Sequence, residues 1–314
     1  MTNRIQRFIA FLLVLCIPIF AIAGCTNNDV ANAANQVTTN ANGTYSIDTK
    51  TTTPEGKLDV YMLDIGQGDA ILLKVGDEYS MIDTGDIEHR ENIVAQLKTM
   101  GVTKLKNIII THPHADHMGG FYAIAKAMPI EHVYDDGIAV DNNMYKTYEK
   151  WIEKNKIQRT TLRSGDVVDF GHGAVFIVYA PWVEPLTDKK GETDLNNNSI
   201  VGKLIFGKFS MLFTGDAEWQ EEKKLIKEQN SRLFARILKV GHHGSRTSNS
   251  EDFLKSIKPE SALISNGMYN KYGHPHDVTL RRLQENNIAI YRTDTMGRIH
   301  ISTDENEWQI TTER

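Results

Sequence analysis

Apolar residues recur along the chain at two spacings, and these spacings predict its strands and helices. Short runs rich in β-branched and aromatic residues predict strands, whereas apolar residues three or four positions apart predict helices. The predicted strands cover residues 58–63, 70–75, 79–82, 105–110, 132–134, two runs within 167–179, 199–206, 208–213, 235–240, 261–264, 288–292 and 298–302. The predicted helices cover residues 88–100, 121–127, 145–155 and 278–287, and one more ends near residue 229. Strands and helices that alternate in this way indicate an α/β fold.

Polar residues gather where the predicted strands end. Four of them follow directly on such strands, namely Asp83, His112, Asp216 and His242. Because open sheets place ligands along the rim of their strand ends, we expect these side chains to share one edge. Three other polar residues are interpreted as turn residues rather than as members of this edge. Gln67 and Asp69 lie in a glycine-rich turn whose backbone they can satisfy, and His172 lies between two glycines at the tip of a predicted hairpin.

The densest polar cluster holds three imidazoles and one carboxylate within six consecutive residues, which are His112, Pro113, His114, Ala115, Asp116 and His117. Imidazole nitrogens and carboxylate oxygens suit zinc and neighbouring transition metals. A solvated polar turn would instead be built from Gly, Asn, Asp and Ser. The cluster therefore predicts a metal site in the loop after the strand 105–110.

Composition places the chain among ordinary globular proteins. Its 314 residues are 40% hydrophobic and 24% charged, and this length suffices for one large domain or two small ones. The formal charge of −5 disfavours a tight, non-specific nucleic-acid binder. Lys239, Arg246 and Lys271 near the predicted rim can still form a local basic patch. Composition alone therefore leaves the substrate open.

The first 24 residues have the pattern of an export signal. Arg4 and Arg7 precede an apolar segment over residues 8–23, and small residues lead into Cys25. This pattern resembles a bacterial lipoprotein signal that is cleaved before Cys25, whose sulfur then carries lipid. An uncleaved membrane anchor is the rival interpretation, which the short apolar span disfavours. Loss of the two arginines takes the charge from −5 to −7, and we expect the mature chain to be lipid-anchored at the extracytoplasmic face of the cell membrane.

The segment after the signal cannot form a core of its own. Residues 26–54 are rich in Asn, Thr and Ala and contain almost no large apolar side chains. We therefore expect a disordered tether over residues 25–55 and one folded domain over residues 56–314. The only cysteines are Cys16 and Cys25, so the mature domain is expected to have neither a disulfide nor a free thiol.

The order of the polar motifs resembles that of the metallo-β-lactamase superfamily. A strand ending in Asp83-Thr-Gly is followed by His-x-His-x-Asp-His at 112–117, by a strand ending in Thr-Gly-Asp216, and by a strand ending in Gly-His-His at 241–243. Finer signatures resemble the soluble C-terminal domain of the ComEC family of competence proteins, and they lie at residues 64–70, 212–216, 239–248 and 272–275. ComEC proteins carry many transmembrane helices, whereas this chain carries one removable signal, so we do not expect a DNA channel.

This resemblance implies a fold and a metal centre. The fold would be a four-layer αββα sandwich, with two mixed sheets face to face, helices outside and the metal site along one edge. Two divalent cations would be bound, with zinc favoured and manganese as the alternative. By position, His112 and His114 would hold the first metal, Asp116 and His117 the second, and Asp216 would bridge them. One of His242 and His243 would complete the second site.

One ligand of the wider superfamily is missing from its usual position. Many members have a histidine between the Asp116-His117 pair and Asp216 as the third ligand of the first metal, whereas this chain reads Asn-Asn-Asn-Ser at 196–199. The other histidine of the His242-His243 pair or a water molecule can take that place. Oxygen ligands at this position would favour manganese over zinc.

The resemblance implies a dinuclear metallohydrolase at the cell surface. Asp116 and Asp216 would be the catalytic carboxylates, and Ser245, Asn266, Tyr272 and His274 are candidates for binding an anionic substrate. We expect a phosphodiester substrate, with extracellular DNA first. The alternatives are another surface metallohydrolase, of phosphorylcholine esterase or lactonase type, or a non-catalytic binding module that retains metal. No obligate protein partner is evident.

Overall fold

The structure, a computed structural model, describes residues 37–39, 45–47 and 56–314. The predicted signal over residues 1–24 and the lipidation site Cys25 lie outside the described residues. Two short strands, β1 (Val37–Thr39) and β2 (Tyr45–Ile47), pair antiparallel within the segment expected to be a tether. Within the described ranges, every helix is too short or too polar to cross a lipid bilayer.

Two large β-sheets form the body of the protein. One contains β3 (Leu58–Met62), β4 (Ala70–Val75), β5 (Glu78–Thr84), β6 (Leu105–Ile109), β7 (Ile130–Asp135), β8 (Gln158–Thr161), β16 (Ile299–Thr303) and β17 (Trp308–Thr312). The other contains β9 (Val167–Gly171), β10 (Ala174–Ala180), β11 (Val201–Phe206), β12 (Phe209–Phe213), β13 (Ile237–Lys239), β14 (Ser261–Ile264) and β15 (Ala289–Arg292). Their strand orders are β17-β16-β3-β4-β5-β6-β7-β8 and β15-β14-β13-β12-β11-β10-β9. Both sheets combine parallel and antiparallel pairs.

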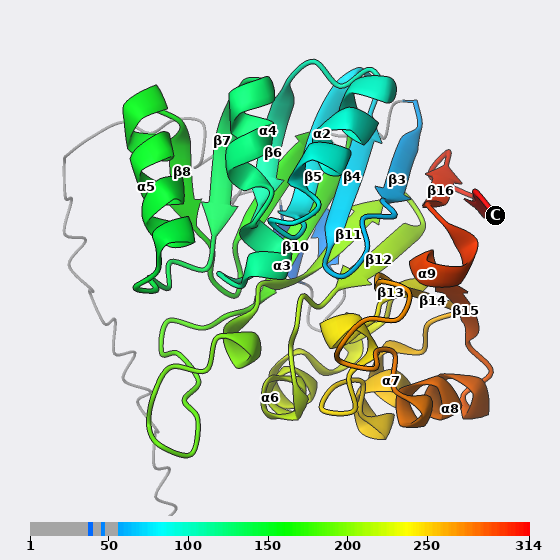
Figure 1. Cartoon of the computed structure of the whole chain (residues 1–314). Helices are drawn as coiled ribbons and strands as arrows, with labels where there is room; N and C mark the ends of the chain where they lie inside the picture. The colour runs from blue at the N-terminus through cyan, green and yellow to red at the C-terminus, as the bar shows by residue number, and fades with distance from the viewer. Residues whose placement is uncertain (1–36, 40–44, 48–55) are drawn as a thin grey trace, which may run out of the picture.

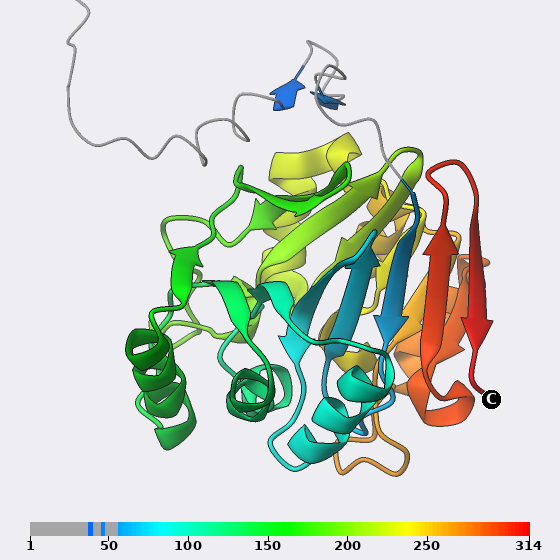
Figure 2. The same cartoon turned by 90° about the horizontal axis from the view of Figure 1, so that it is seen from above.

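Helices cover the outer face of each sheet (Figure 1). The eight-stranded sheet carries α2 (Arg90–Thr99), α4 (Phe121–Ala127) and α5 (Asn143–Asn155), and the seven-stranded sheet carries α6 (Trp219–Gln229), α7 (Glu251–Ile257) and α8 (Asp277–Glu285). Figure 2 shows the two sheets one behind the other, with strands of both running through the middle of the molecule. The expected four-layer αββα sandwich is confirmed.

The apolar side chains form one layer between the sheets and one under each set of helices. Strand β10 shows why its sequence is continuously apolar. Phe176 and Val178 point into the layer between the sheets, whereas Ile177 and Tyr179 belong to the layer under α6, α7 and α8. Because both faces of this inner strand are covered, it lacks the alternation of a half-exposed strand.

The structure contains elements that the apolar pattern did not predict. Strands β8 and β17 lie at the two edges of their sheet, and their side chains are mostly exposed or half-buried. Strand β8 has no apolar residue, and β17 has only Trp308 and Ile310. Helix α7 has only seven residues, and its start is marked by Ser250, whose Oγ accepts a hydrogen bond from Phe253 N at 3.3 Å. His172 is exposed in the β9–β10 turn, which confirms the predicted hairpin.

Two pairs of parallel strands bring the polar motifs together. Strand β5 pairs with β6 in one sheet, and β12 pairs with β13 in the other. The segments that follow these strands meet at one end of the sandwich, because His112 after β6 lies beside Asp216 after β12. The sandwich thus places residues from both sheets around one centre.

Candidate metal centre

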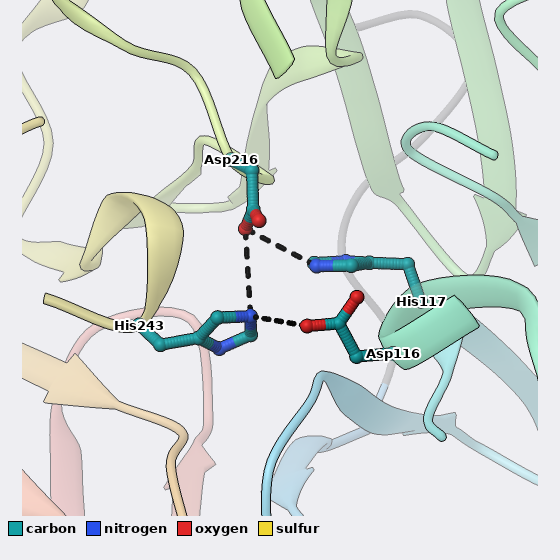
Figure 3. Close-up of side chains that lie close together, drawn as sticks. All are labelled: Asp116, His117, Asp216 and His243. Carbon is teal, nitrogen blue, oxygen red and sulfur yellow. Dashed lines mark ion pairs between the residues drawn. The ribbon is translucent and has the colours of Figure 1, made fainter. Parts of the chain in front are cut away.

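The first group of candidate ligands surrounds one oxygen of Asp216. Asp116, His117, Asp216 and His243 each offer a ligand atom, and these atoms all lie within 4.8 Å of one another. His117 Nε2 is 3.1 Å and His243 Nε2 is 3.6 Å from Asp216 Oδ1, and His243 Nε2 is 3.4 Å from Asp116 Oδ2. Figure 3 shows the two imidazoles and the two carboxylates pointing at a common space.

The second group surrounds the other oxygen of Asp216. His112, His114 and Asp216 offer ligand atoms within 4.8 Å of one another. His112 Nε2 lies 3.0 Å from His114 Nδ1 and 3.8 Å from Asp216 Oδ2. His242 Nε2 lies 3.6 Å from the same Oδ2 atom. Asp216 therefore presents Oδ1 to one group and Oδ2 to the other, which is the geometry of a bridging carboxylate.

Four imidazoles of the centre have a polar oxygen close to their outer nitrogen. The Nδ1 atoms lie 2.8 Å from Asp83 Oδ2 in His117, 2.8 Å from Ser265 O in His243, 3.1 Å from Glu218 Oε1 in His242 and 3.2 Å from Thr111 Oγ1 in His112. In His117 and His243 the carboxylate or carbonyl partner can accept a hydrogen bond from Nδ1–H, which directs Nε2 toward the metal position. Glu218 was not among the residues singled out from the sequence.

The inner atoms of the centre suit a cation. His117 Nε2, His243 Nε2 and Asp216 Oδ1 are buried and have no hydrogen-bond partner in the described part of the chain. Burial favours a higher pKa for Asp216, but His117 and His243 outweigh it and hold that pKa well below its usual range. Imidazoles that lose a proton when a cation binds, grouped around an ionised carboxylate, form a donor set that binds divalent transition metals. The residues present therefore fit a dinuclear metal site.

A comparison with known protein families identifies the domain. The sequence pattern of the metallo-β-lactamase superfamily matches residues 63–267. The chain belongs to this superfamily. Among curated proteins it is 29% identical over 245 residues to competence protein ComA of Neisseria gonorrhoeae, which covers 78% of the chain and 32% of that protein. It is 30% identical over 264 residues to ComE operon protein 3 of Bacillus subtilis, covering 78% of the chain and 33% of that protein.

These comparisons confirm the resemblance to the ComEC family of competence proteins. This chain spans about a third of the length of these curated relatives. Among solved structures, the metallo-β-lactamase fold protein YhfI of Bacillus subtilis aligns with a TM-score of 0.54 at 11% identity, covering 77% of this chain and 99% of that one. At such identity the likeness concerns the fold alone.

In this metallo-β-lactamase domain, the two neighbouring histidines face different groups. His242 and His243 both have positive φ angles, of 51° and 53°, between two glycines. Two left-handed residues in succession turn the chain so that His243 joins the Asp116 group and His242 stands beside Asp216 Oδ2. We infer that His242 supplies the third nitrogen of the first metal position.

The segment 196–199 has other roles. The Asn198 side chain is buried and bonds the backbone of Leu186 and Asp194, and Ser199 Oγ accepts a hydrogen bond from Asp216 N at 3.1 Å. Ser199 therefore holds the backbone of Asp216 in place.

Replacing His242 by alanine tests this assignment. We expect His242→Ala to lower the affinity of the His112-His114 position for metal by about 100-fold, because this position loses a nitrogen ligand. The position formed by Asp116, His117 and His243 keeps all of its ligands. Zinc content after dialysis and competition with a chromogenic chelator measure the effect. His172→Ala, in the exposed β9–β10 turn, is the matched control. Two zinc ions held with wild-type affinity by His242→Ala would refute the assignment.

Asp69 and Lys239 have roles that differ from those expected. Lys239 is 1% exposed, and its Nζ lies 2.6 Å from Asp69 Oδ2, so the prediction that Lys239 joins a surface basic patch was wrong. Arg246 and Lys271 are exposed. Asp69 is equally buried, and its Oδ1 lies 3.5 Å from His243 Nδ1, so it reaches beyond its turn.

The turn is held close to the ligands by a glycine. Asp69 N donates to Asp116 O at 3.0 Å, and a Cβ on Gly68 would stand 2.4 Å from that same oxygen. Gly68 also has a φ of 119°, which disfavours other residues. Asp69 is thereby held within reach of both Lys239 and His243.

A cavity of about 310 Å³ opens over the metal centre. Its lining residues are Gln67, His114, Ala115, Asp116, Asn196, Asp216, His242, His243, Tyr272 and His274. Two candidate substrate-binding residues, Tyr272 and His274, are in this lining and two are not. Ser245 is buried with its Oγ 2.9 Å from Thr247 Oγ1, and the buried Asn266 donates from Nδ2 to His274 O at 3.3 Å. Gln67, interpreted as a turn residue, lines the cavity, and its Oε1 accepts from Gly267 N at 3.4 Å.

Proposed function

We propose that this domain is a dinuclear metal-dependent phosphodiesterase that cleaves extracellular DNA. The observation that carries the proposal is the bridging position of Asp216 between two sets of ligand atoms at the floor of an open cavity. Two sets that share one carboxylate are the arrangement used for in-line displacement at phosphorus. Similarity to competence proteins favours DNA among phosphodiesters.

The proposed metals are held by residues of both sheets. His112, His114, His242 and Asp216 would bind one cation, and Asp116, His117, His243 and Asp216 the other. Nitrogen supplied by His242 favours zinc at the first position, with manganese as the alternative. If these residues bind two divalent cations, the site would gain a water molecule of lowered pKa and positive charge to offset the negative charge of a phosphate.

The chain itself positions the reacting groups. Asp116 lines the cavity, and its pKa lies below the usual range: burial opposes this, but the neighbouring imidazoles of His243 and His117 outweigh burial. An ionised Asp116 accepts a hydrogen bond from the attacking water and holds it in line with phosphorus. Exposed Arg246 and Lys271 supply positive charge for flanking phosphates, which the acidic chain otherwise lacks.

An activity screen tests the function. Zinc- or manganese-loaded protein is expected to hydrolyse bis-p-nitrophenyl phosphate and to shorten single-stranded DNA, with no turnover after chelation. A phosphorylcholine ester and a homoserine lactone serve as comparison substrates. Turnover of either comparison substrate without phosphodiester cleavage would assign a different hydrolase, and full metal occupancy without any turnover would indicate a binding module.

We also propose that a lipid on Cys25 holds the domain at the outer face of the cell membrane. The support is the sequence pattern before Cys25. In cells fed a labelled fatty acid, the wild-type chain is expected to carry the label and to lack residues 1–24, whereas Cys25→Ala is expected to carry no label. Equal labelling of the two proteins, or an unlabelled wild type, would refute the lipid anchor.

A further inference from the structure

One loop beside the cavity exposes large apolar side chains. Met268, Tyr269 and Tyr272, between β14 and α8, are 58%, 97% and 51% exposed. Eight large hydrophobic side chains are exposed in the described part of the chain, and three of them fall within these five consecutive residues. Apolar side chains gathered at the mouth of a site mark a surface that contacts a ligand.

The loop is shaped by one of its own side chains. Asn270 Oδ1 accepts hydrogen bonds from Tyr272 N at 3.2 Å and His274 N at 3.0 Å. Asn270 Nδ2 donates to Gly267 O at 2.9 Å and His274 O at 2.6 Å. Because Asn270 satisfies this backbone, the exposed side chains are not needed to hold the loop. The loop is therefore pre-organised, which lowers the entropic cost of binding.

Three rings form a column that leads from the metal centre to solvent. His243 and His274 stack with their centroids 6.2 Å apart and an interplanar angle of 27°. His274 and Tyr272 continue the stack at 5.6 Å and 21°. Tyr272 thus lines the cavity and presents its ring roughly parallel to the His274 ring, which in turn stacks on His243. A flat aromatic group bound at the mouth of the cavity can extend this column.

Lys271 adds a positive charge to the same surface. Its Nζ lies 5.1 Å from the centroid of the Tyr272 ring. An ammonium group at this ring repels a quaternary ammonium ligand, so the loop does not resemble an aromatic cage for choline. The ammonium group of Lys271 attracts a phosphate instead. A nucleotide has a planar base next to a phosphate and therefore matches this surface.

We propose that Tyr269 and Tyr272 stack on unpaired bases of the substrate and that Lys271 contacts a phosphate between them. The inference rests on the proposed phosphodiesterase function and narrows its substrate to single-stranded DNA. In a duplex the faces of the bases are covered by their neighbours, so protein rings stack on bases that are unpaired or at a frayed end. Tyr272 in the cavity lining and Tyr269 in the same loop are therefore specificity-determining residues of this site.

The experiment compares two DNA substrates that have the same phosphates, one with bases and one with abasic sites. Wild type, Tyr272→Ala and Tyr272→Phe are assayed on a fluorescent oligo(dT) and on an oligonucleotide of the same length with abasic sites. We expect Tyr272→Ala to raise KM for oligo(dT) by about 10-fold or more and to leave KM for the abasic strand within about 2-fold, because only the first substrate has bases to stack. Tyr272→Phe keeps the ring and is expected to behave as wild type.

The control is Tyr122→Ala, because Tyr122 is a 41% exposed tyrosine on α4 that does not line the cavity. Equal losses on both substrates, or a wild type that processes both alike, would overturn the inference while the phosphodiesterase function stands. If wild type cleaves no phosphodiester, the proposed function fails. Base stacking is then tested by the fluorescence anisotropy of labelled oligo(dT) mixed with metal-loaded protein. Binding lost in Tyr272→Ala but kept in Tyr122→Ala and Tyr272→Phe would support base stacking, and any other pattern would overturn it.

Discussion

Asp216→Asn is expected to abolish turnover and to remove at least one of the two proposed metals while leaving the fold intact. Asp216 Oδ1 faces His117 and His243, and Oδ2 faces His112 and His242. An amide of the same shape offers one neutral oxygen and an NH2 group, so it cannot bind a cation on both sides. Loss of the bridge is expected to lower kcat/KM by about 1,000-fold or more, or about 4 kcal/mol of transition-state stabilisation.

Three measurements make this prediction specific. Metal content reports the bridge, hydrolysis of bis-p-nitrophenyl phosphate reports turnover, and circular dichroism of metal-free protein reports the fold. Asp77→Asn, at an exposed aspartate in the β4–β5 turn, controls for loss of a carboxylate elsewhere. Turnover within about 10-fold of wild type, with two metals bound, would show that Asp216 does not bridge.

The positions of strand ends in the sequence predicted that His112, Asp216 and His242 share an edge. The assignment of the cluster at 112–117, Asp216 and the His242-His243 pair to one metal centre came from the resemblance to the metallo-β-lactamase superfamily, because strands β6 and β12 lie in different sheets. The sequence could not separate His242 from His243. That distinction depends on two successive positive φ angles, and neither residue is a glycine that would have signalled them.

The buried ion pair of Asp69 and Lys239 beside the centre could not be predicted from the sequence. A lysine in a strand is normally expected at the surface, since burial of its ammonium group is costly without a partner. The partner of Lys239 is Asp69, from the other sheet's β3–β4 turn and far away in sequence, so nothing local predicts the pair. The glycines around Asp69 made a turn role the simpler interpretation.

The overall fold was more predictable inside than at its edges. Strand β10 is apolar throughout because both of its faces are covered, and this is visible in the sequence. Strand β17 packs only in part and has one neighbouring strand, so Trp308–Thr312 carries too few apolar residues to stand out. Apolar patterns report burial, and an edge strand with little burial leaves little pattern.

Lys239→Met is expected to lower the free energy of unfolding by about 3–5 kcal/mol, because it leaves the buried Asp69 carboxylate without its cation. Burial alone favours a raised pKa for Asp69, but Lys239 and His243 outweigh it and hold that pKa at about 2. Urea denaturation of metal-free protein at neutral pH measures the loss. Lys208→Met, at an exposed lysine in the β11–β12 turn, is expected to change the free energy by less than about 0.5 kcal/mol.

The double variant Asp69→Asn/Lys239→Met separates the ion pair from simple packing. Since removal of both charges leaves no isolated ion, its cost is expected to be smaller than the sum of the two single costs. If the cost of the double variant equals the sum of the two single costs, the attraction between the two charges contributes nothing to stability. Metal binding gives a second, independent readout, because Asp69 also lies beside His243 Nδ1. Lys239→Met is therefore expected to weaken the Asp116-side metal by about 10- to 100-fold, although Lys239 itself never touches it.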